Sequence, residues 1–250
     1  MDELLDFTGQ VALVTGGSRG LGKEMALAMA ARGADVVVTS RKLDACEEVA
    51  RQIEGMGRSA LAYACHVGRW EEIQGLVDAA YEKFGKVDIL INNAGLSPLY
   101  PSLVDVNEEL FDKVVGLNLK GPFRLMALVG DRMAKGDGGS MINISSTASV
   151  NPSPTSEPYG AAKSGLNALT RSFAFEYGPK VRVNCIIAGP FLTDIAKAWD
   201  MDAFEERARN NIALGRGGQP DEIVGAALYL ASPSSTFTSG TTIRVDGGSP

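Results

Sequence analysis

Short apolar segments alternate with longer segments of helical periodicity along almost the whole chain. The short segments are continuously apolar, as at 11–15 and 35–40, rather than alternating apolar with polar. This pattern predicts strands at 11–15, 35–40, 59–64, 87–92, 140–145, 181–187 and 242–245, and helices at 21–31, 43–56, 70–84, 108–129 (starting near 105), 159–177 and 220–231. Strands that helices cover on both faces have this continuous pattern. We therefore expect an α/β fold, a doubly wound parallel sheet of about seven strands with helices on both faces.

The length and composition are those of one ordinary globular domain. The chain has 250 residues, of which 45% are hydrophobic and 22% charged, and that length buries a full core. We find no linker or repeat, so we predict a single domain over 1–250, with a substrate lid around 190–215.

Charge and cysteine content narrow the class of function. The net charge of −6 and the pI near 5.0 argue against a nucleic-acid or anionic-membrane surface. The N-terminal sequence lacks the pattern of a signal peptide, and no apolar run suits a membrane span. Cys46, Cys65 and Cys185 are far apart and His66 is the single histidine, so we predict free thiols, no metal site and no histidine-based triad. A cytoplasmic protein is the expectation.

The polar and glycine-rich motifs follow predicted strands. Gly16, Gly20 and Gly22 follow the first strand, the segment 92–95 (Asn-Asn-Ala-Gly) follows the fourth, and Ser146 follows the fifth. Ligands of doubly wound sheets bind at the carboxyl ends of the strands, which predicts one site at this edge. Glycines between a strand and a helix let backbone N–H groups approach a pyrophosphate, although such a turn often needs glycine for its own geometry.

Tyr159 and Lys163 lie four residues apart in a helical pattern, so they share one face. A phenol titrates near pH 10, and a cation within about 4–6 Å lowers that pKa toward the range of a useful acid–base group. A hydroxyl from Ser145 or Ser146 could hold a substrate oxygen against the phenol. The arrangement predicts a site that moves a proton on and off an alcohol or carbonyl; the alternative is a chance spacing beside serines that cap a turn.

Asn118 stands inside a helical pattern, where asparagine is not favoured. Pro122 has no N–H to bond the Asn118 carbonyl, and its ring crowds that carbonyl. We therefore predict a kink there and a carbonyl that needs a water molecule. The alternative is a plain kink with a solvated carbonyl.

Together these motifs resemble those of the short-chain dehydrogenase/reductase family, over essentially the whole chain. The matching pieces are Thr15-Gly16-x-x-x-Gly20-x-Gly22, Asn92-Asn93-Ala94-Gly95, Asn118, Ser146, Tyr159-x-x-x-Lys163 and Asp246-Gly247-Gly248. The resemblance implies an NAD(P)-dependent oxidoreductase on a Rossmann fold with a Ser–Tyr–Lys site. In that family Tyr159 would be the general acid–base, Lys163 would lower its pKa and bind the nicotinamide ribose, and Ser146, thirteen residues before Tyr159, would hold the substrate oxygen.

The resemblance also implies roles for the cofactor site and for Asn118. A water on the Asn118 carbonyl would link Lys163 to solvent as a proton relay. The implied cofactor-binding residues are Gly16, Ser18, Arg19, Gly20, Leu21, Gly22, Ser40, Arg41, His66, Val67, Asn93, Ala94, Gly95, Tyr159, Lys163, Pro190 and Thr193.

The residues at the end of the second strand indicate whether the nicotinamide cofactor is NAD or NADP. A carboxylate there would bond the 2′-hydroxyl of NAD, whereas arginine accommodates a 2′-phosphate. The segment 39–42 reads Thr-Ser-Arg-Lys, and Arg19 can face the same pocket. Two guanidinium groups suit a phosphate, which predicts NADP(H). One alternative is that the cofactor is NAD. The other is that Arg41 only begins a solvent-exposed helix and contacts no cofactor.

Two positions depart from the family pattern. His66 stands where the family usually has aspartate, and we expect it either to contact the adenine or to be an exposed, idle imidazole. The usual Pro-Gly after strand six reads Gly189-Pro190 here. The family pattern therefore does not fix the residue at which the substrate lid begins.

Three loops, at 96–102, 147–158 and 191–212, should surround the substrate. They offer mainly apolar side chains: Leu96, Leu99, Tyr100, Phe191, Ile195, Trp199, Met201 and Phe204. Such a pocket suits a ketone or secondary alcohol of moderate size, although Trp199 and Met201 could pack the lid on itself. Arg124, Arg132 and Arg171 could dock an acyl carrier protein, as in the related 3-oxoacyl-acyl carrier protein reductases; a non-catalytic dinucleotide-binding sensor and a redox-neutral lyase or dehalogenase are further alternatives.

The helix at 159–177 has two stripes. Ala162, Leu166, Leu169 and Phe173 should face the sheet, whereas Ala161, Gly165, Ala168 and Ser172 form a stripe of small residues. The family assembles through this helix and the one that carries Asn118, so the resemblance implies a homotetramer.

Overall fold

The sheet has the predicted parallel, doubly wound arrangement. The computed structural model describes residues 3–152, 154–194, 196 and 200–249. Neighbouring strands pair in parallel in the order β3-β2-β1-β4-β5-β6-β7. The strands are β1 (Val11–Thr15), β2 (Asp35–Ser40), β3 (Ala60–Ala64), β4 (Ile89–Asn92), β5 (Gly139–Ser146), β6 (Val181–Ala188) and β7 (Thr242–Val245). The order reverses between β1 and β4, so their carboxyl ends form the switch point of the sheet.

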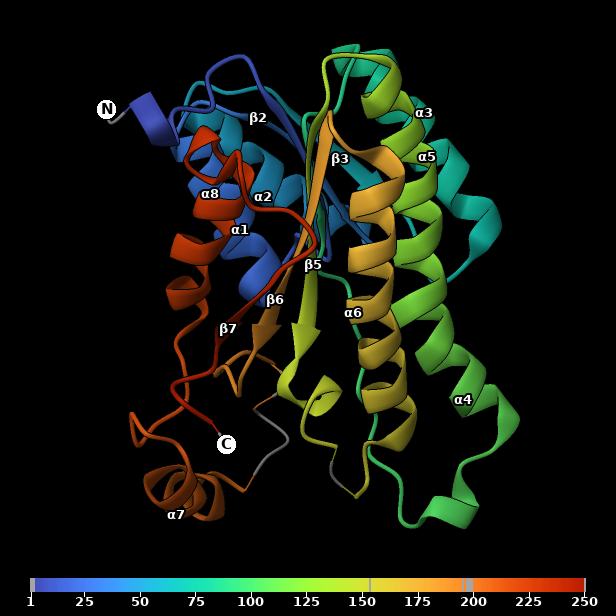
Figure 1. The fold of residues 1–250 in the computed structure, drawn as a ribbon, viewed down its shortest axis with the longest axis vertical. Helices are drawn as coiled ribbons and strands as arrows, with labels where there is room; N and C mark the ends of the chain where they lie inside the picture. The colour runs from blue at the N-terminus through green and yellow to red at the C-terminus, as the bar shows by residue number, and fades with distance from the viewer. Residues whose placement is uncertain (1–2, 153, 195, 197–199, 250) are drawn as a thin grey trace.

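Helices cover both faces of the sheet, as Figure 1 shows. The group α1, α2 and α8 packs on one face, and the group α3, α5 and α6 packs on the other. The helices are α1 (Gly20–Ala31), α2 (Leu43–Gly55), α3 (Trp70–Phe84), α4 (Glu108–Val115), α5 (Gly121–Lys135), α6 (Glu157–Tyr177), α7 (Met201–Asn211) and α8 (Val224–Ala231). α7 lies beyond the carboxyl ends of the strands, apart from both layers.

Two hydrophobic cores, one on each side of the sheet, explain the continuous apolar strands. Alternate residues of a strand point to opposite faces, so Val36 and Val38 enter the core with α1 and α2, whereas Val37 enters the core with α3. All five residues of β1 are buried. α6 contributes Leu166 and Phe173 to the second core, which confirms the predicted sheet-facing stripe.

The structure differs from the predicted elements around the long helix. The helix begins at Glu108 rather than near 105, because the Asn107 side chain caps it by accepting a hydrogen bond from the Leu110 N–H at 2.8 Å. It then passes through a π-turn, Gly116–Lys120, where the Gly121 N–H bonds the Gly116 carbonyl. The disruption predicted at Asn118 takes the form of this wide turn, because Pro122 cannot donate a normal helical hydrogen bond.

α7 was not predicted from the sequence. Only Phe204 and Ala208, four residues apart, are buried in this helix, so the apolar pattern is too sparse to show a helical period. Its start is fixed locally, because the Asp200 carboxylate accepts a hydrogen bond from the Ala203 N–H at 3.1 Å. Nearby, the helix predicted at 220–231 begins as a 3₁₀ helix, Pro220–Ile223, before α8.

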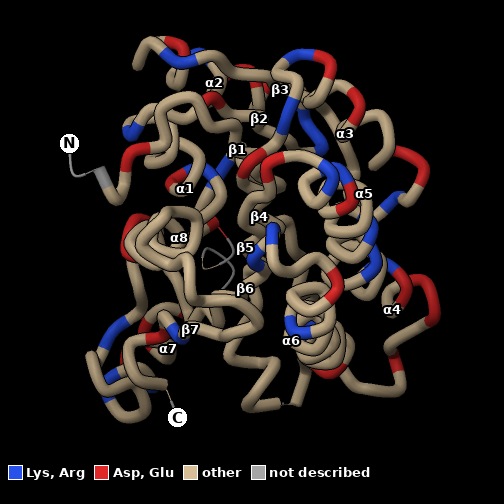
Figure 2. Tube along the Cα trace, turned by 45° about the horizontal axis from the view of Figure 1, so that its top comes forward, with Lys and Arg blue, Asp and Glu red and all other residues tan. Residues whose placement is uncertain are grey.

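Acidic and basic residues are interspersed over the outer helices (Figure 2). No helix in the described part of the chain combines the length and the apolar character that crossing a bilayer requires. Cys46, Cys65 and Cys185 are buried free cysteines, as predicted.

Candidate active site

The carboxyl ends of β1 and β4 are tied together by one hydroxyl. Thr15 Oγ1 accepts hydrogen bonds from the backbone N–H groups of Asn93 (3.0 Å) and Ala94 (3.1 Å). It donates to the Ile91 carbonyl at 3.3 Å. Two of the sequence motifs, the glycine turn and the segment 92–95, are thereby held side by side at the switch point.

The glycine turn after β1 depends on missing side chains. Gly16 and Gly20 have φ angles of +62° and +52°, in the left-handed region that favours glycine. A Cβ atom at Gly22 would overlap the Gly16 carbonyl oxygen and the Asn93 amide. That Asn93 amide donates to the carbonyls of Thr15 (2.9 Å) and Gly16 (3.2 Å). Asn93, predicted to bind cofactor, thus also holds the turn closed against α1.

The start of α1 has the donors that a pyrophosphate needs. Its N-cap residue is Arg19, whose guanidinium cannot accept hydrogen bonds from the first N–H groups of the helix. Such a helix start, reached through glycines, suits a phosphate anion. Thr193, predicted to contact the cofactor, lies against this turn: a Cβ at Gly20 would be 3.4 Å from Thr193 Cγ2. Arg19 Nη1 is 3.8 Å from Asp194 Oδ2.

The end of β2 lies next to the glycine turn. The Gly17 N–H donates to the Thr39 carbonyl at 3.1 Å, which joins the two segments. Ser40 is half-buried, and the hydroxyl donates to the Lys42 carbonyl at 3.3 Å. Arg41 is exposed. Since no acidic side chain occurs in 39–43, this end of the strand offers cations and hydroxyls to a ligand.

Of the two alternatives for His66, the structure excludes an exposed imidazole without contacts. The ring is half-buried, and Nδ1 accepts a hydrogen bond from the Gly68 N–H at 3.1 Å. The His66 N–H donates to Glu72 Oε2 at 2.7 Å. The next residue, Val67, is buried, and its carbonyl packs so closely on Gly121 that a Cβ there would overlap it. The loop after β3 is therefore fixed against the π-turn region, and an adenine contact by His66 stays a prediction.

Ser146, Tyr159 and Lys163 converge from β5 and α6. A side-chain hydrogen bond links Ser146 with Tyr159. Lys163 is 3% exposed, and Nζ lies 5.8 Å from the centre of the Tyr159 ring. The ammonium donates to the Ile144 carbonyl at 2.7 Å. Ser145 has a different role, since its hydroxyl donates to the Lys163 carbonyl at 3.4 Å.

The pKa predicted for Tyr159 is corrected by the structure. Burial raises the pKa of the phenol above its usual value, and the hydrogen bond with Ser146 lowers it by a smaller amount. Although Tyr159 keeps part of its surface exposed, the surrounding protein atoms desolvate the phenolate. The prediction that Lys163 lowers the pKa of Tyr159 is therefore wrong for the chain without a bound dinucleotide. Burial also lowers the pKa of Lys163 to about 8.

The buried ammonium predicts a pH-dependent stability difference between the wild type and Lys163→Met. The pKa of Lys163 is about 8 in the folded chain and 10.5 in its ordinary state, so the unfolded chain binds more protons between these values. Wild-type stability therefore rises with pH across this window, and the buried charge costs the folded state most below pH 8. Between neutral pH and pH near 10.5, the free energy of unfolding of Lys163→Met should therefore fall by roughly 3 kcal/mol relative to that of the wild type.

Denaturant unfolding of the two proteins across this pH range measures the effect. Lys180→Met is the matched control, because that ammonium also donates to a carbonyl, Gly136 O at 2.9 Å, but is exposed. A difference between wild type and Lys163→Met that stays constant with pH would show that the pKa of Lys163 is not lowered.

Asn118 connects the π-turn with the substrate loop. Its side chain is fully buried, and Nδ2 donates to the carbonyls of Leu96 (2.8 Å) and Val114 (2.9 Å). Oδ1 accepts from the Leu96 N–H at 3.2 Å. A Cβ at Gly95 would lie 3.0 Å from Asn118 Oδ1 and 3.7 Å from Lys163 Nζ. The asparagine thus fixes the chain directly beside Lys163, a side-chain role that the sequence did not suggest.

The residues expected to surround the substrate differ widely in burial. Phe191 and Phe204 are buried and pack against Gly218 and Gly217, respectively. Leu99 is 77% exposed. Leu96 and Tyr100 are half-buried, Met201 is exposed, and Ile195 and Trp199 lie outside the described residues. Part of the predicted pocket wall is therefore lid packing.

Tyr100 brings the substrate loop to the start of α6. Its hydroxyl donates to the Glu157 carboxylate and accepts from the Glu157 N–H at 2.9 Å. This hydrogen bond lowers the pKa of Glu157. The carboxylate is thus held in its charged form two residues before Tyr159.

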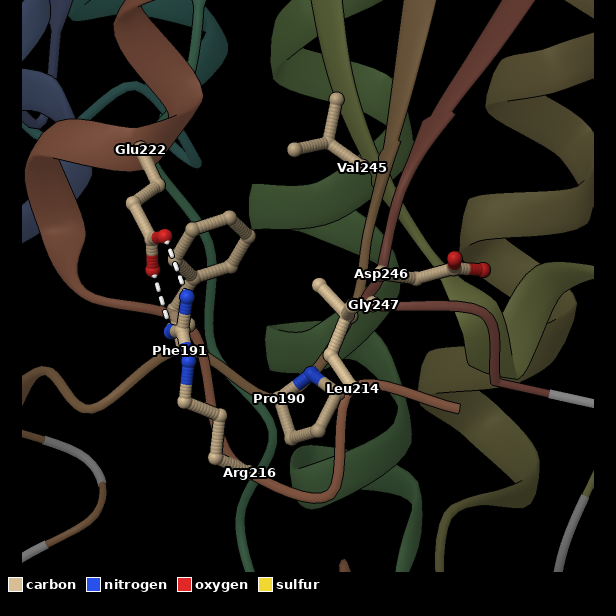
Figure 3. Close-up of a pocket in the computed structure, with 10 residues that line it drawn as sticks. Pro190, Phe191, Leu214, Arg216, Glu222, Val245, Asp246 and Gly247 are labelled. Carbon is tan, nitrogen blue, oxygen red and sulfur yellow. Dashed lines mark hydrogen bonds and ion pairs between the residues drawn. The ribbon is translucent and has the colours of Figure 1, made fainter. Parts of the chain in front are cut away.

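A hollow of about 190 Å³ lies beside Pro190, at the ends of β6 and β7 (Figure 3). One wall carries the ion pair between Arg216 and Glu222, joined by two hydrogen bonds of 2.7 Å. Neither Tyr159 nor Lys163 lines it. The lining of this hollow therefore does not include the Ser–Tyr–Lys group.

Two of the three arginines expected to dock an acyl carrier protein have partners on the chain itself. Arg132 pairs with Asp78, and its guanidinium lies 4.5 Å from the centre of the Tyr81 ring. Arg124 lies over the Trp70 ring at 4.7 Å. Arg171 is exposed on α6. These contacts weaken the interpretation of the three as one docking patch.

The chain is similar to known oxidoreductases over nearly its whole length. The profile of the family described as Enoyl-(Acyl carrier protein) reductase matches residues 16–249. The human protein Dehydrogenase/reductase SDR family member 4 is 36% identical over 243 residues, 96% of this chain and 87% of that protein. The 7alpha-hydroxysteroid dehydrogenase of Escherichia coli (strain K12) is 37% identical over 245 residues, 98% of this chain and 95% of the relative.

Solved structures give the same result. A 7alpha-hydroxysteroid dehydrogenase complexed with NADH and 7-oxo glycochenodeoxycholic acid superposes with a TM-score of 0.95 at 36% identity, covering 100% of this chain and 97% of that one. A short-chain type dehydrogenase/reductase from Mycobacterium marinum has a TM-score of 0.92 at 33% identity, covering 98% and 97%.

Proposed function

Because the chain belongs to the short-chain dehydrogenase/reductase family, an oxidoreductase family that binds nicotinamide dinucleotides, we propose that it interconverts a carbonyl and a secondary alcohol with NADP(H). One observation carries this proposal. Ser146 and Lys163 converge on Tyr159 at the same sheet edge as the glycine turn that precedes α1. A proton-transferring group and a phosphate site in one crevice are what such a reaction needs.

The chain supplies proton transfer and orientation. Hydride exchange with the substrate carbon is the chemistry that the nicotinamide supplies when bound. The Tyr159 hydroxyl gives its proton to the carbonyl oxygen in reduction and takes the alcohol proton in oxidation. The Ser146 hydroxyl, bonded to Tyr159, holds the substrate oxygen. Lys163 binds the ribose, and a water on the Asn118 carbonyl returns protons to the site.

The preference for NADP(H) follows from the end of β2. Arg41 is exposed there beside Ser40, and the glycine turn that carries Arg19 is bonded to the same strand end. These groups match a 2′-phosphate, and NAD remains the alternative, since a relative of 36% identity has been solved with NADH. Gly16, Ser18, Leu21 and Gly22 would hold the pyrophosphate.

Arg41→Ala is expected to weaken NADP(H) binding by about 10- to 100-fold, because a charge-assisted bond to phosphate contributes about 1.5–3 kcal/mol. Affinity for NAD(H) should stay within about twofold of wild type. Fluorescence titration with both reduced dinucleotides measures this. Arg51→Ala is the control, because Arg51 is also exposed but lies on α2, away from the end of β2. Equal losses for both dinucleotides would contradict a role in cofactor choice.

We also propose a cytoplasmic homotetramer. On α6, Ala161, Ala168 and Ser172 are exposed small residues available to a second copy. Gly165 is not available in the same way, because a Cβ there would come within 3.1 Å of Leu119 of the same chain. Sedimentation equilibrium tests the assembly; a monomer would contradict it.

A 3-oxoacyl-acyl carrier protein reductase is the second candidate, because the description of the matching profile also names an acyl carrier protein substrate. A panel of ketones, secondary alcohols and a 3-oxoacyl carrier substrate, each with both dinucleotides, separates the two by the change in reduced-nicotinamide absorbance. Turnover of free ketones supports the main proposal. Turnover of the carrier-bound substrate alone supports the second, and no turnover of any would favour a non-catalytic sensor.

A further inference from the structure

The turn that carries Ser146 is tied to α6 by a chain of hydrogen bonds that the mechanism above does not use. Ser149, in the 3₁₀ helix Thr147–Ser149, donates from its hydroxyl to the Ser146 carbonyl at 2.6 Å. The Asn167 side-chain amide donates to that same Ser149 hydroxyl at 2.8 Å. The backbone of Ser146 is thereby connected, through two hydrogen bonds, to the helix that carries Tyr159.

The other end of the Asn167 amide is also engaged. Its Oδ1 accepts from Cys185 Sγ at 3.4 Å, and Cys185 is fully buried in β6. Burial raises the pKa of this thiol to about 11, so it remains a donor near neutral pH. Because one end of the amide faces a donor and the other an acceptor, its orientation is fixed. Ser164 adds a third tie, its hydroxyl donating to the Ser149 carbonyl at 2.7 Å.

This chain of bonds controls the geometry that the proton transfer needs. The Ser146 hydroxyl has to reach both the phenol and the substrate oxygen, and a displacement of about 1 Å in such a group can cost up to about 100-fold in rate. We propose that Asn167 and Ser149 are positioning residues, which hold the Ser146 hydroxyl against Tyr159 during proton transfer. This inference rests on the proposed function.

Asn167→Ala and Ser149→Ala test the proposal in two independent ways. Each should lower kcat/KM for a carbonyl substrate about tenfold, while dinucleotide affinity stays at the wild-type value. Ser149→Thr keeps a hydroxyl and should restore most of the activity. The two alanine variants keep Tyr159 and Lys163, whose Nζ lies 5.8 Å from the centre of the Tyr159 ring, and they keep Cys185, which interacts electrostatically with Lys163.

The pH profile gives a readout that loss of stability alone would not move. Alcohol oxidation requires the phenolate, so its rate rises with pH through the pKa of Tyr159. The hydrogen bond with Ser146 lowers that pKa. A loosened Ser146 should therefore move the rising limb to higher pH.

Asn184→Ala is the matched control. Asn184 is a fully buried asparagine of the same strand as Cys185, and its side chain bonds the turn before β7, accepting from the Thr241 N–H at 3.2 Å and donating to the Thr238 carbonyl at 2.8 Å. It should lose stability and keep the kcat/KM and pH profile of the wild type. Wild-type kinetics in both alanine variants, or the same kinetic change in Asn184→Ala, would overturn the inference. If instead Tyr159→Phe retained full turnover, the proposed function itself would fail.

Discussion

Tyr159→Phe is expected to lower kcat by about 10³-fold, because the ring remains and only the hydroxyl that transfers the proton is lost. The Ser146 hydroxyl loses its bonding partner, but the glycine turn and the end of β2 are unchanged. Dinucleotide affinity should therefore stay within about twofold of wild type. Steady-state kinetics with the best substrate of the panel, together with a fluorescence titration, measures both quantities.

Tyr177→Phe serves as the control for this substitution. Tyr177 is the last residue of the same helix, and its hydroxyl donates to the Ala127 carbonyl at 3.1 Å, away from the site. It should keep wild-type turnover. A Tyr159→Phe variant with turnover within a few-fold of wild type would remove the phenol from the chemistry.

The second large effect is expected for Gly22→Ala. A methyl group there would overlap the Gly16 carbonyl oxygen and the Asn93 amide, so the turn or the start of α1 has to move. Overpacking of this kind costs about 1–3 kcal/mol of folding stability. Because the first N–H groups of α1 move with the turn, the dissociation constant for both dinucleotides should rise at least about tenfold.

Gly225→Ala provides the comparison for the glycine substitution. Gly225 lies in α8, where a Cβ would meet no atom within 4 Å. Replacing a helical glycine with alanine in open space should stabilise the fold by about 0.5–1 kcal/mol and leave dinucleotide binding unchanged. Thermal unfolding with and without dinucleotide measures both variants. Unaltered dinucleotide affinity in Gly22→Ala would mean that the glycine turn is not the phosphate site.

The sheet and its edge could be predicted because their signals are local and redundant. Each strand is a continuous apolar run, and each motif follows the end of such a run, so the strand order was not needed to place Thr15, Asn93 and Ser146 near one another. α7 has no comparable signal, since its buried positions are only Phe204 and Ala208. The π-turn could be predicted as a disruption of the helix at Asn118, because Pro122 has no N–H that could bond the Asn118 carbonyl.

The electrostatics of the site could not be predicted in the same way. The spacing of Tyr159 and Lys163 indicates proximity, but the sequence does not show that the ammonium bonds the Ile144 carbonyl or that burial outweighs the hydrogen bond with Ser146. Backbone carbonyls leave no residue-type signal. Ser149 and Asn167 were missed for a related reason, since their partners are a carbonyl and a hydroxyl that meet only in the folded chain.

The pH dependence of alcohol oxidation tests the central claim, that the phenol of Tyr159 transfers the proton beside the dinucleotide site. Oxidation needs the phenolate, and burial raises the pKa of this group; the account therefore predicts a rate that rises with pH into the alkaline range in the wild type. The residual rate of Tyr159→Phe should lack that rise. An identical rise in both proteins would contradict the assignment.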